Sequence, residues 1–375
     1  MQFPYQLEAK INQRIENNSL RKLYFTNDLI DFSSNDYLGF SRNETIFNQT
    51  NQFLEDNHFN QNGATGSRLI SGNYQWYQDV EQEIANFHKV EKALIYANGY
   101  AANLGLISAI AQKDCVILYD QYCHASIIDG IRLGFSKYFK FPHLDYNYLE
   151  NLLQKNQSQT VFVLTESLFS MDGTIPDLKN ISELCNQYNA YLIVDEAHAI
   201  GVLGKNGEGL IQELNLENQI FARIVTFGKA MGCHGAAILG SVKLIEYLIN
   251  FSRSFIYSTA LPPHAMATIQ MAYQYLKKHH ELPEKLRQKI AFFGENFKYF
   301  LPNSPIQTLI LGNTDKTKKA AQLLIENKFD VKAILSPTVE KGKERLRICI
   351  HEYNTKEEIN QLTQYLNQWK IESFL

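Results

Sequence analysis

The feature that most constrains the fold of this chain is a series of short apolar runs between Ala93 and Gly240. Each run has the length of a strand, and most are separated by stretches long enough for a helix, such as Leu178 to Tyr188. Strands that alternate with helices predict a largely parallel sheet covered on both faces, so the expected fold class is α/β. The runs are Ala93 to Ala97, Val116 to Tyr119, Tyr138 to Phe141, Val161 to Thr165, Tyr191 to Val194, Ile224 to Phe227 and Ala236 to Leu239.

The pattern changes on either side of this block. At 375 residues the chain exceeds the size at which a single core usually stops growing, so a large domain and a smaller one are expected. We predict a large cofactor-binding α/β domain over residues 46–275 and a small α+β domain over residues 276–375. The N-terminal segment 1–45 is expected to join the small domain. The flanking elements that we predict are helices at Tyr5 to Leu23, Pro263 to about Phe300, Lys316 to Lys328 and Lys356 to Trp369, and strands at Leu29 to Phe32, Gln307 to Leu311 and Arg345 to Ile350.

Composition excludes several classes of protein. A formal net charge of -3 provides no general field that would attract nucleic acid. The five cysteines are scattered and form no CxxC pair, which argues against a disulfide framework and against a metal site. The N-terminal residues lack the apolar stretch of a signal peptide, and no run of about 18 apolar residues could span a bilayer. We therefore expect a soluble, cytoplasmic protein without a membrane partner.

The polar residues that follow the apolar runs are the first candidates for chemistry, because ligands of open α/β sheets collect at the carboxyl ends of strands. Asp195 and His198 follow one run, and Lys229 follows the next. A buried ammonium is costly and has a depressed pKa, which favours use of the amine as a nucleophile. Lys229 with Asp195 would suit pyridoxal phosphate, which needs an amine for a Schiff base and an acid against its ring nitrogen.

Other residues could complete such a site. Gly99 and Tyr100 belong to a turn that enters a helix, where free N–H groups can hold a phosphate, and Thr226 could add a hydroxyl. His124 follows a predicted strand and could stack on a flat ring. Each residue also has an ordinary structural interpretation when taken singly: a hydrogen-bonded histidine, a helix-entry glycine, or a lysine whose amine extends to solvent.

One competing interpretation comes from Asp195-Glu196-Ala197-His198, which spells the DEAH box of nucleotide-driven helicases. That activity requires a P-loop, GxxxxGK[ST]. The Gly-Lys pairs of this chain are followed by Asn206, Ala230 and Glu344 instead of Ser or Thr. The helicase interpretation fails for this reason.

Several motifs, in order along nearly the whole chain, resemble those of the α-oxoamine synthases, a family of fold type I pyridoxal-phosphate enzymes. This resemblance implies a fold type I transferase with a mostly parallel central sheet and a smaller α+β domain built from both chain ends. The motifs are Phe32 to Gly39, Gly66 to Gly72, His124-Ala125-Ser126, Phe169 to Gly173, Val194 to His198, Thr226 to Gly232 and Ser258 to Pro263.

The resemblance also implies roles for individual residues of the cofactor site. Lys229 would carry pyridoxal 5'-phosphate, Asp195 would pair with its ring nitrogen, and His124 would stack on the ring. His198 and Ser170 would contact the phenolic oxygen. The residues implied for the phosphate and the adjoining edge are Gly99, Tyr100 and Thr226, with Ser258 and Thr259 reaching the phosphate of a neighbouring subunit in a homodimer.

Two arginines outside the central block are implied to bind substrate. Ser336-Pro337-Thr338-Val339, followed by Glu344-Arg345-Leu346-Arg347-Ile348, resembles the family segment whose second arginine, here Arg347, holds the amino-acid carboxylate. A guanidinium suits that task because two parallel hydrogen bonds fix both charge and orientation, although an ordinary strand-end ion pair would use the same residue. Arg21 resembles another substrate-contact position of the family. The chain departs from the family pattern at Gln121-Tyr122-Cys123, just before His124, and at Glu340, just after Ser336-Pro337-Thr338-Val339.

The activity implied is the condensation of an amino acid with an acyl-CoA or an acyl-carrier-protein thioester. Within the family, the motifs at Ser33 to Gly39 and Gly66 to Gly72 resemble most the members that join L-alanine to a pimeloyl thioester in biotin synthesis. Glycine with acetyl-CoA, and serine with a long acyl thioester, are the alternatives inside the family. An aminotransferase, which transfers an amino group to a keto acid and releases no CoA, is the alternative of a different class.

Overall fold

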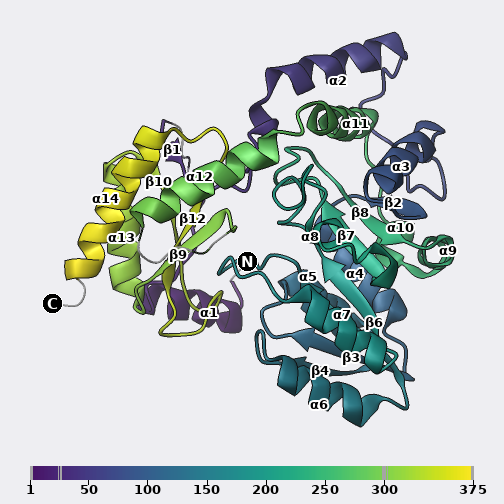
Figure 1. Cartoon of the computed structure of the whole chain (residues 1–375), viewed down its shortest axis with the longest axis horizontal. Helices are drawn as coiled ribbons and strands as arrows, with labels where there is room; N and C mark the ends of the chain where they lie inside the picture. The colour runs from purple at the N-terminus through teal and green to yellow at the C-terminus, as the bar shows by residue number, and fades with distance from the viewer. Residues whose placement is uncertain (1–2, 24, 26–27, 298–300, 302, 373–375) are drawn as a thin grey trace. The chain divides into compact units, whose positions relative to one another are not determined.

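The computed structural model describes residues 3–23, 25, 28–297, 301 and 303–372 of the chain (Figure 1). The chain divides into two compact units. The large unit contains residues 35–170 and 174–286, and the small unit contains residues 1–34, 171–173 and 287–375. These divisions lie at residues 34 and 287, whereas the sequence patterns suggest 45 and 276. Within the described residues, no helix is long and apolar enough to cross a membrane.

The large unit is built on a seven-stranded sheet with the order β2-β8-β7-β6-β5-β3-β4. Neighbouring strands from β7 to β4 run parallel, while β8 is antiparallel to both β2 and β7. The mostly parallel sheet confirms the predicted α/β fold class. The strands are β2 (Lys92–Tyr96), β3 (Cys115–Asp120), β4 (Lys137–Phe141), β5 (Thr160–Glu166), β6 (Tyr191–Asp195), β7 (Ala222–Thr226) and β8 (Ala236–Gly240).

Helices cover this sheet because alternate strand residues point to opposite faces and both faces are apolar. Ile117, Leu164 and Ile224 belong to one buried cluster with residues of α4, α5 and α9. The helices α6 and α7 pack against each other and against β3, β4 and β6. The helices of this unit are η1 (Phe40–Arg42), α2 (Glu44–Asp56), α3 (Trp76–Phe87), α4 (Gly99–Ile110), α5 (Ala125–Leu133), α6 (Tyr146–Asn156), α7 (Leu178–Gln187), α8 (Leu210–Glu213), η2 (Glu217–Gln219), α9 (Val242–Phe251), α10 (Arg253–Ile256) and α11 (Pro263–Lys278), with the start of α12 (Leu282–Asn296).

The small unit is an α+β structure to which both ends of the chain contribute, as predicted. Strands β1 and β10 form a parallel pair, and β11-β12-β9 form an antiparallel sheet. Its elements are α1 (Tyr5–Glu16), β1 (Ile30–Asp31), β9 (Ile306–Ile310), α13 (Thr314–Glu326), β10 (Phe329–Asp330), β11 (Lys332–Ile334), β12 (Arg345–Cys349) and α14 (Lys356–Glu372), with the end of α12.

Two predicted helices differ from the structure. The helix expected from Pro263 to about Phe300 is two helices, α11 and α12, and the last three residues of the expected range lie outside the described residues. Pro283 explains the break: it has no N–H to donate, and its ring would clash with the carbonyl four residues earlier, so it is found in the first turn of a new helix. The N-terminal helix ends at Glu16 rather than Leu23, because Asn18 adopts a left-handed conformation with φ 46°.

Candidate active site

Three strand ends of the large unit meet at one pocket of about 280 Å³, which we call the strand-end pocket. Asp195 ends β6, Glu166 ends β5, and Lys229 follows β7 by three residues. This convergence is what parallel neighbours produce, because their carboxyl ends lie at one edge of the sheet. The pocket is lined by Asn98, Gly99, Tyr100, Asn103, His124, Ser126, Glu166, Asp195, Ala197, His198, Thr226, Gly228, Lys229, His234 and Gly235.

The carboxylate of Asp195 is held in a fixed orientation. Asn103 Nδ2 donates to Asp195 Oδ2 at 2.7 Å, and the backbone N–H of Ala197 donates to Oδ1 at 2.9 Å. Asp195 is 5% exposed, so few water molecules compete for these bonds. A buried carboxylate with both oxygens bonded is prepared to face a cationic ligand group, such as a protonated ring nitrogen.

Asn103 also connects Asp195 to His124. Its Nδ2 donates to Ser126 Oγ at 3.0 Å, and that hydroxyl lies 2.8 Å from His124 Nδ1. The backbone N–H of Ser126 donates to the same nitrogen at 3.3 Å, so Nδ1 is the acceptor and Nε2 carries the proton of the neutral ring. Desolvation lowers the pKa of His124 and outweighs the opposing effect of Asp195, which favours this neutral form.

Glu166 is a second buried carboxyl group in the pocket, at 3% exposure. It pairs with Asp195 in the register of β5 and β6, and its Oε1 accepts the backbone N–H of His124 at 2.6 Å. Burial and the nearby charge of Asp195 raise its pKa well above the usual range, although Lys229 opposes this shift. Glu166 therefore fixes the backbone from which His124 projects.

The N-terminus of α4 forms another wall of the pocket. Asn98 caps the helix by accepting the N–H of Ala101 at 2.8 Å, and the preceding N–H groups of a helix have no intrahelical partner. A Cβ at Gly99 would lie 2.5 Å from Thr226 Cγ2, so only glycine allows α4 to begin this close to the end of β7. The first backbone N–H groups of α4, together with the positive end of the helix dipole, make an anion site.

Two further predicted contacts of the cofactor have partners within the protein. Thr226 Oγ1 donates to the carbonyl of Ala197 at 3.3 Å, so this hydroxyl would have to turn before it could donate to a phosphate. His198 Nδ1 lies 2.8 Å from the hydroxyl of Tyr37. Ser170 is buried in the segment after β5 and does not line the strand-end pocket, so its predicted contact stays a prediction.

The remaining predicted residues lie elsewhere. Ser258 and Thr259 line a small separate cavity of the large unit, with Arg68 and Leu261. Both predicted substrate arginines belong to the small unit. Arg21 Nη2 donates to Thr338 Oγ1 at 3.1 Å.

Arg347 lies on β12, the central strand of its sheet, and is 7% exposed. Its Nη1 donates to Cys349 Sγ at 2.9 Å. The substrate roles of both arginines stay predictions.

A buried ion pair lies next to the pocket. Glu196, which follows Asp195, is 0% exposed, and its partner Arg223 on β7 is 1% exposed. Arg223 Nε donates to Glu196 Oε2 at 2.9 Å. The guanidinium also donates to the carbonyls of His88 and Glu208, each at 3.1 Å. This pair ties the strand that ends in Asp195 to the strand that precedes Lys229.

Asn103, Ser126 and Glu166 line the pocket, but the sequence patterns assigned no individual role to these three residues. Ser126 stands in a motif quoted above, and Glu166 directly follows a predicted buried strand. A carboxyl group at the end of such a strand indicates a residue of the ligand site, because ligands of open α/β sheets bind at the carboxyl ends of strands. Asn103 ends the turn that the sequence predicts to hold a phosphate, and the packing of α4 on the sheet brings its amide to Asp195.

Comparison with known proteins adds to this geometry. Residues 27–366 match the model of the class I and II aminotransferases. The chain is 37% identical over 369 residues to 8-amino-7-oxononanoate synthase of Emericella nidulans, covering 91% of this chain and 89% of the relative.

Two solved structures are similar over most of their length. One is the 8-amino-7-oxononanoate synthase of Francisella tularensis, with a TM-score of 0.79, 30% identity, and coverage of 92% of this chain and 99% of the other. The other is a serine palmitoyltransferase of S. paucimobilis with bound PLP-myriocin aldimine, with a TM-score of 0.89, 24% identity and 98% coverage of both chains. At this lower identity, the second similarity concerns the fold alone.

Proposed function

Because this chain belongs to the α-oxoamine synthases, pyridoxal-phosphate enzymes related to the class I and II aminotransferases, we propose that it condenses L-alanine with a pimeloyl thioester to form 8-amino-7-oxononanoate. The thiol of the carrier and carbon dioxide are the other products. The observation that carries the proposal is the convergence of Lys229, Asp195 and the N-terminus of α4 on one pocket. The relative from Emericella nidulans, which is named for this activity and is 89% covered by this chain, supports the choice of substrates.

The residues of the strand-end pocket fit pyridoxal 5'-phosphate. The N-terminus of α4, with no side chain at Gly99, would take the phosphate, and the carboxylate held by Asn103 would take the ring nitrogen. Lys229 would hold the cofactor through its amine, and His124 would cover the ring. When bound, the cofactor withdraws electrons from the α-carbon of the amino acid.

The chain's own residues would then perform the proton transfers. Once alanine has taken its place, the amine of Lys229 is the base that removes the α-proton and later returns a proton to the product. Asp195 keeps a positive charge on the group that faces it, which is the electrostatic part of the rate acceleration. We propose that Arg347 anchors the carboxylate of alanine and that Arg21 contacts the acyl donor.

We also propose a homodimer in which Ser258 and Thr259 of one chain reach the phosphate in the pocket of the other. Their place in a cavity separate from their own chain's strand-end pocket is the observation behind this proposal. Light scattering of the purified holoenzyme should give twice the mass of one chain. Thr259→Val should weaken retention of the cofactor, and a monomer with full cofactor content would contradict the arrangement.

A substrate matrix tests the activity. The purified protein would be incubated with alanine, glycine or serine against pimeloyl, acetyl and palmitoyl thioesters, and thiol release would be followed. Alanine with the pimeloyl donor should turn over fastest. A faster reaction of glycine with acetyl-CoA, or of serine with palmitoyl-CoA, would assign a sister activity, and amino transfer to a keto acid without thiol release would assign an aminotransferase.

The role of Arg347 has its own test. Arg347→Ala should raise the KM for alanine by roughly tenfold to a hundredfold, since a charge-assisted hydrogen bond contributes about 1.5–3 kcal/mol. The absorbance of the bound cofactor should stay unchanged. An unaltered KM would remove Arg347 from the substrate site while leaving the rest of the assignment intact.

A further inference from the structure

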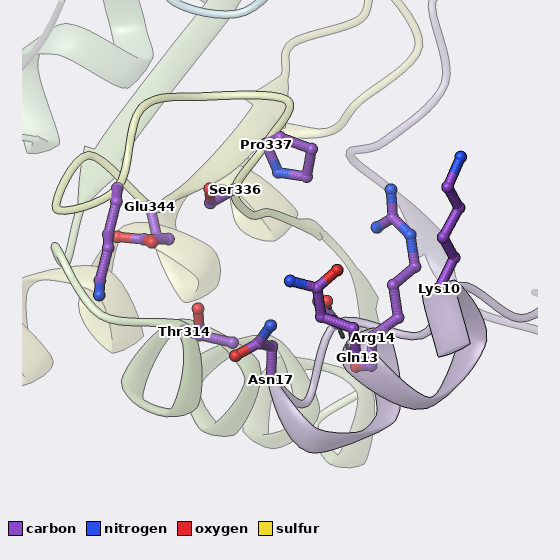
Figure 2. A pocket seen from close by; sticks show the side chains of 10 residues that line it. Lys10, Gln13, Arg14, Asn17, Thr314, Ser336, Pro337 and Glu344 are labelled. Atoms are coloured by element: carbon purple, nitrogen blue, oxygen red, sulfur yellow. Dashed lines mark hydrogen bonds between the residues drawn. The ribbon is translucent and has the colours of Figure 1, made fainter. Parts of the chain in front are cut away.

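The small unit contains a second polar cavity, of about 570 Å³, that the proposed reaction does not use. We call it the cationic cavity. Figure 2 shows Lys10 and Arg14 projecting from α1, with Gln13 and Asn17 directed towards the side that carries Thr314 and Glu344. Its lining residues are Lys10, Gln13, Arg14, Asn17, Ser19, Thr314, Ser336, Pro337, Lys341 and Glu344.

Three cationic side chains, from two distant parts of the sequence, line this cavity. Lys10 and Arg14 are four residues apart and therefore lie on one face of α1, while Lys341 comes from the loop before β12. Among the residues that the structure describes, none of the three forms an ion pair. By contrast, Lys343 in the same loop lies 2.7 Å from Glu340.

Among the described lining residues, Glu344 is the one carboxylate against three cations. Glu344 is 3% exposed, and its Oε2 accepts the backbone N–H of Gly342 at 2.9 Å. Its negative charge is thus directed to the loop that carries Lys341. The described lining therefore carries more positive than negative charge, which favours an anionic ligand.

Neutral hydrogen-bond donors complete the lining. Gln13 and Asn17 contribute amides, and Ser336 and Thr314 contribute hydroxyls. Thr314 is also the first residue of α13, a helix of 13 residues whose N-terminal end attracts negative charge. Asp315 in the same turn opposes this attraction, but its carboxylate accepts a hydrogen bond from Asn18 Nδ2 at 2.8 Å.

The chemistry of the lining restricts the ligand. Its described residues include no aromatic side chain on which a nucleobase could stack, and Pro337 is the one apolar ring among them. Guanidinium and ammonium groups surrounded by amides and hydroxyls suit phosphate oxygens. A volume of this size, within the usual range for small-molecule sites, accommodates more than one phosphate group.

We propose that the cationic cavity binds a diphosphate group, either free or as part of a nucleotide-linked molecule. Lys10, Arg14 and Lys341 contact its oxygens, and Thr314 and Ser336 donate hydrogen bonds. The site lies entirely within the small unit and does not depend on the reaction proposed for the strand-end pocket.

Calorimetry on the full-length protein loaded with pyridoxal phosphate tests this site, because the cofactor then occupies the anion site of the strand-end pocket. Inorganic pyrophosphate is the first probe, and ADP is the nucleotide-linked probe. Saturable binding of pyrophosphate with one site per chain is expected. Tighter binding of ADP would identify a nucleotide-linked source, whereas tighter binding of pyrophosphate would identify a free one.

Three variants locate the binding. Arg14→Gln and Lys341→Gln should each weaken pyrophosphate binding about tenfold or more, since each removes a charge-assisted contact. Lys343→Gln is the matched control, because this lysine belongs to the same loop and does not line the cavity. No saturable binding, equal weakening by the control, or adenosine binding as tightly as ADP would overturn the proposal. None of these measurements uses turnover, so the result stands whatever the substrate matrix shows.

Discussion

The strand-end pocket and the cationic cavity are both polar hollows, but they hold their charged groups in opposite ways. In the strand-end pocket, Asp195 and Glu166 are almost fully buried and accept hydrogen bonds from neighbouring protein groups. In the cationic cavity, Lys10 and Lys341 are exposed and Arg14 is half-buried. A pocket of the first kind fixes the geometry of its ligand before binding, whereas one of the second kind supplies charge and lets long side chains adapt.

This difference has a cause in the local structure. The strand-end pocket is assembled from the ends of adjacent strands, whose register fixes each side chain within the sheet. The cationic cavity is assembled from one helix, one helix end and a loop. We therefore expect substitutions in the first region to affect rate and stability together, and substitutions in the second to affect anion binding alone.

The largest expected effect is on turnover. Lys229→Ala should reduce thiol release by roughly 10²–10⁴-fold or more, since it removes the proposed base and the attachment of the cofactor. Borohydride reduction followed by peptide mapping should place the cofactor on Lys229 in the unaltered protein. Lys205→Ala, in another Gly-Lys pair, is the control and should keep near-normal activity. A cofactor found on a different lysine would refute the central assignment.

The next effect concerns stability and compares one arginine from each region. Arg223→Met should lower the free energy of unfolding by about 3–5 kcal/mol, because it leaves the carboxylate of Glu196 buried without its cation. Arg14→Gln in the cationic cavity should change it by no more than about 0.5 kcal/mol. Urea unfolding followed by circular dichroism measures both.

The double variant Arg223→Met/Glu196→Leu sharpens this second prediction. It should recover much of the lost stability, because no unpaired charge remains buried. If the double variant is as unstable as Arg223→Met alone, the loss arises from packing and not from the charge.

A smaller effect is expected at the acid of the strand-end pocket. Asp195→Asn should lower kcat about a hundredfold or more while the protein stays folded, because a neutral partner no longer favours a positive ring nitrogen. The matched change is Asp177→Asn, at the N-cap of α7, where asparagine caps as well as aspartate and activity should persist. Near-normal turnover of a folded Asp195→Asn protein would exclude the proposed role.

Much of the fold could be predicted from the sequence, because the strands of the large unit are continuous apolar runs with both faces buried. Each predicted strand there overlaps an observed strand. The helices α2 and α3 were not predicted, although Asn43 before Glu44 is a typical N-cap. The separation of α11 from α12 was also not predicted, because the apolar spacing of this region conceals the effect of Pro283.

The candidate site was predictable only in part, because some of its residues are brought together by tertiary packing and not by sequence order. Asp195 ends one strand and Lys229 follows the next strand by three residues, so their place at one edge of the sheet could be inferred from sequence order alone. Asn103 reaches Asp195 from a helix, and Lys341 lines the same cavity as Arg14 although the two are far apart in the sequence. Such arrangements depend on tertiary packing, and no local pattern of residues predicts them.

The smallest expected effect is a pH dependence of stability that comes from the buried network beside the strand-end pocket. His88 is 0% exposed, with Nε2 3.0 Å from the hydroxyl of Tyr273 and Nδ1 3.4 Å from Arg223 Nη2. The guanidinium can only donate, so Nδ1 must accept and the imidazole is neutral. Burial, with a further contribution from Arg223, holds the pKa of His88 well below its usual value of 6.5.

The sign of this pH effect follows from proton binding. Below about pH 6.5 the unfolded chain takes up a proton at His88 and the folded chain does not, so its contribution to stability falls with pH until the folded pKa is reached. The slope is about 1.4 kcal/mol per pH unit. Because Glu166, whose pKa is raised, acts in the opposite direction, the quantity to measure is the difference in unfolding free energy between the unaltered protein and His88→Gln. That difference should shrink as the pH falls from 6.5 to 5, and a constant difference would show that His88 does not remain neutral in the folded protein.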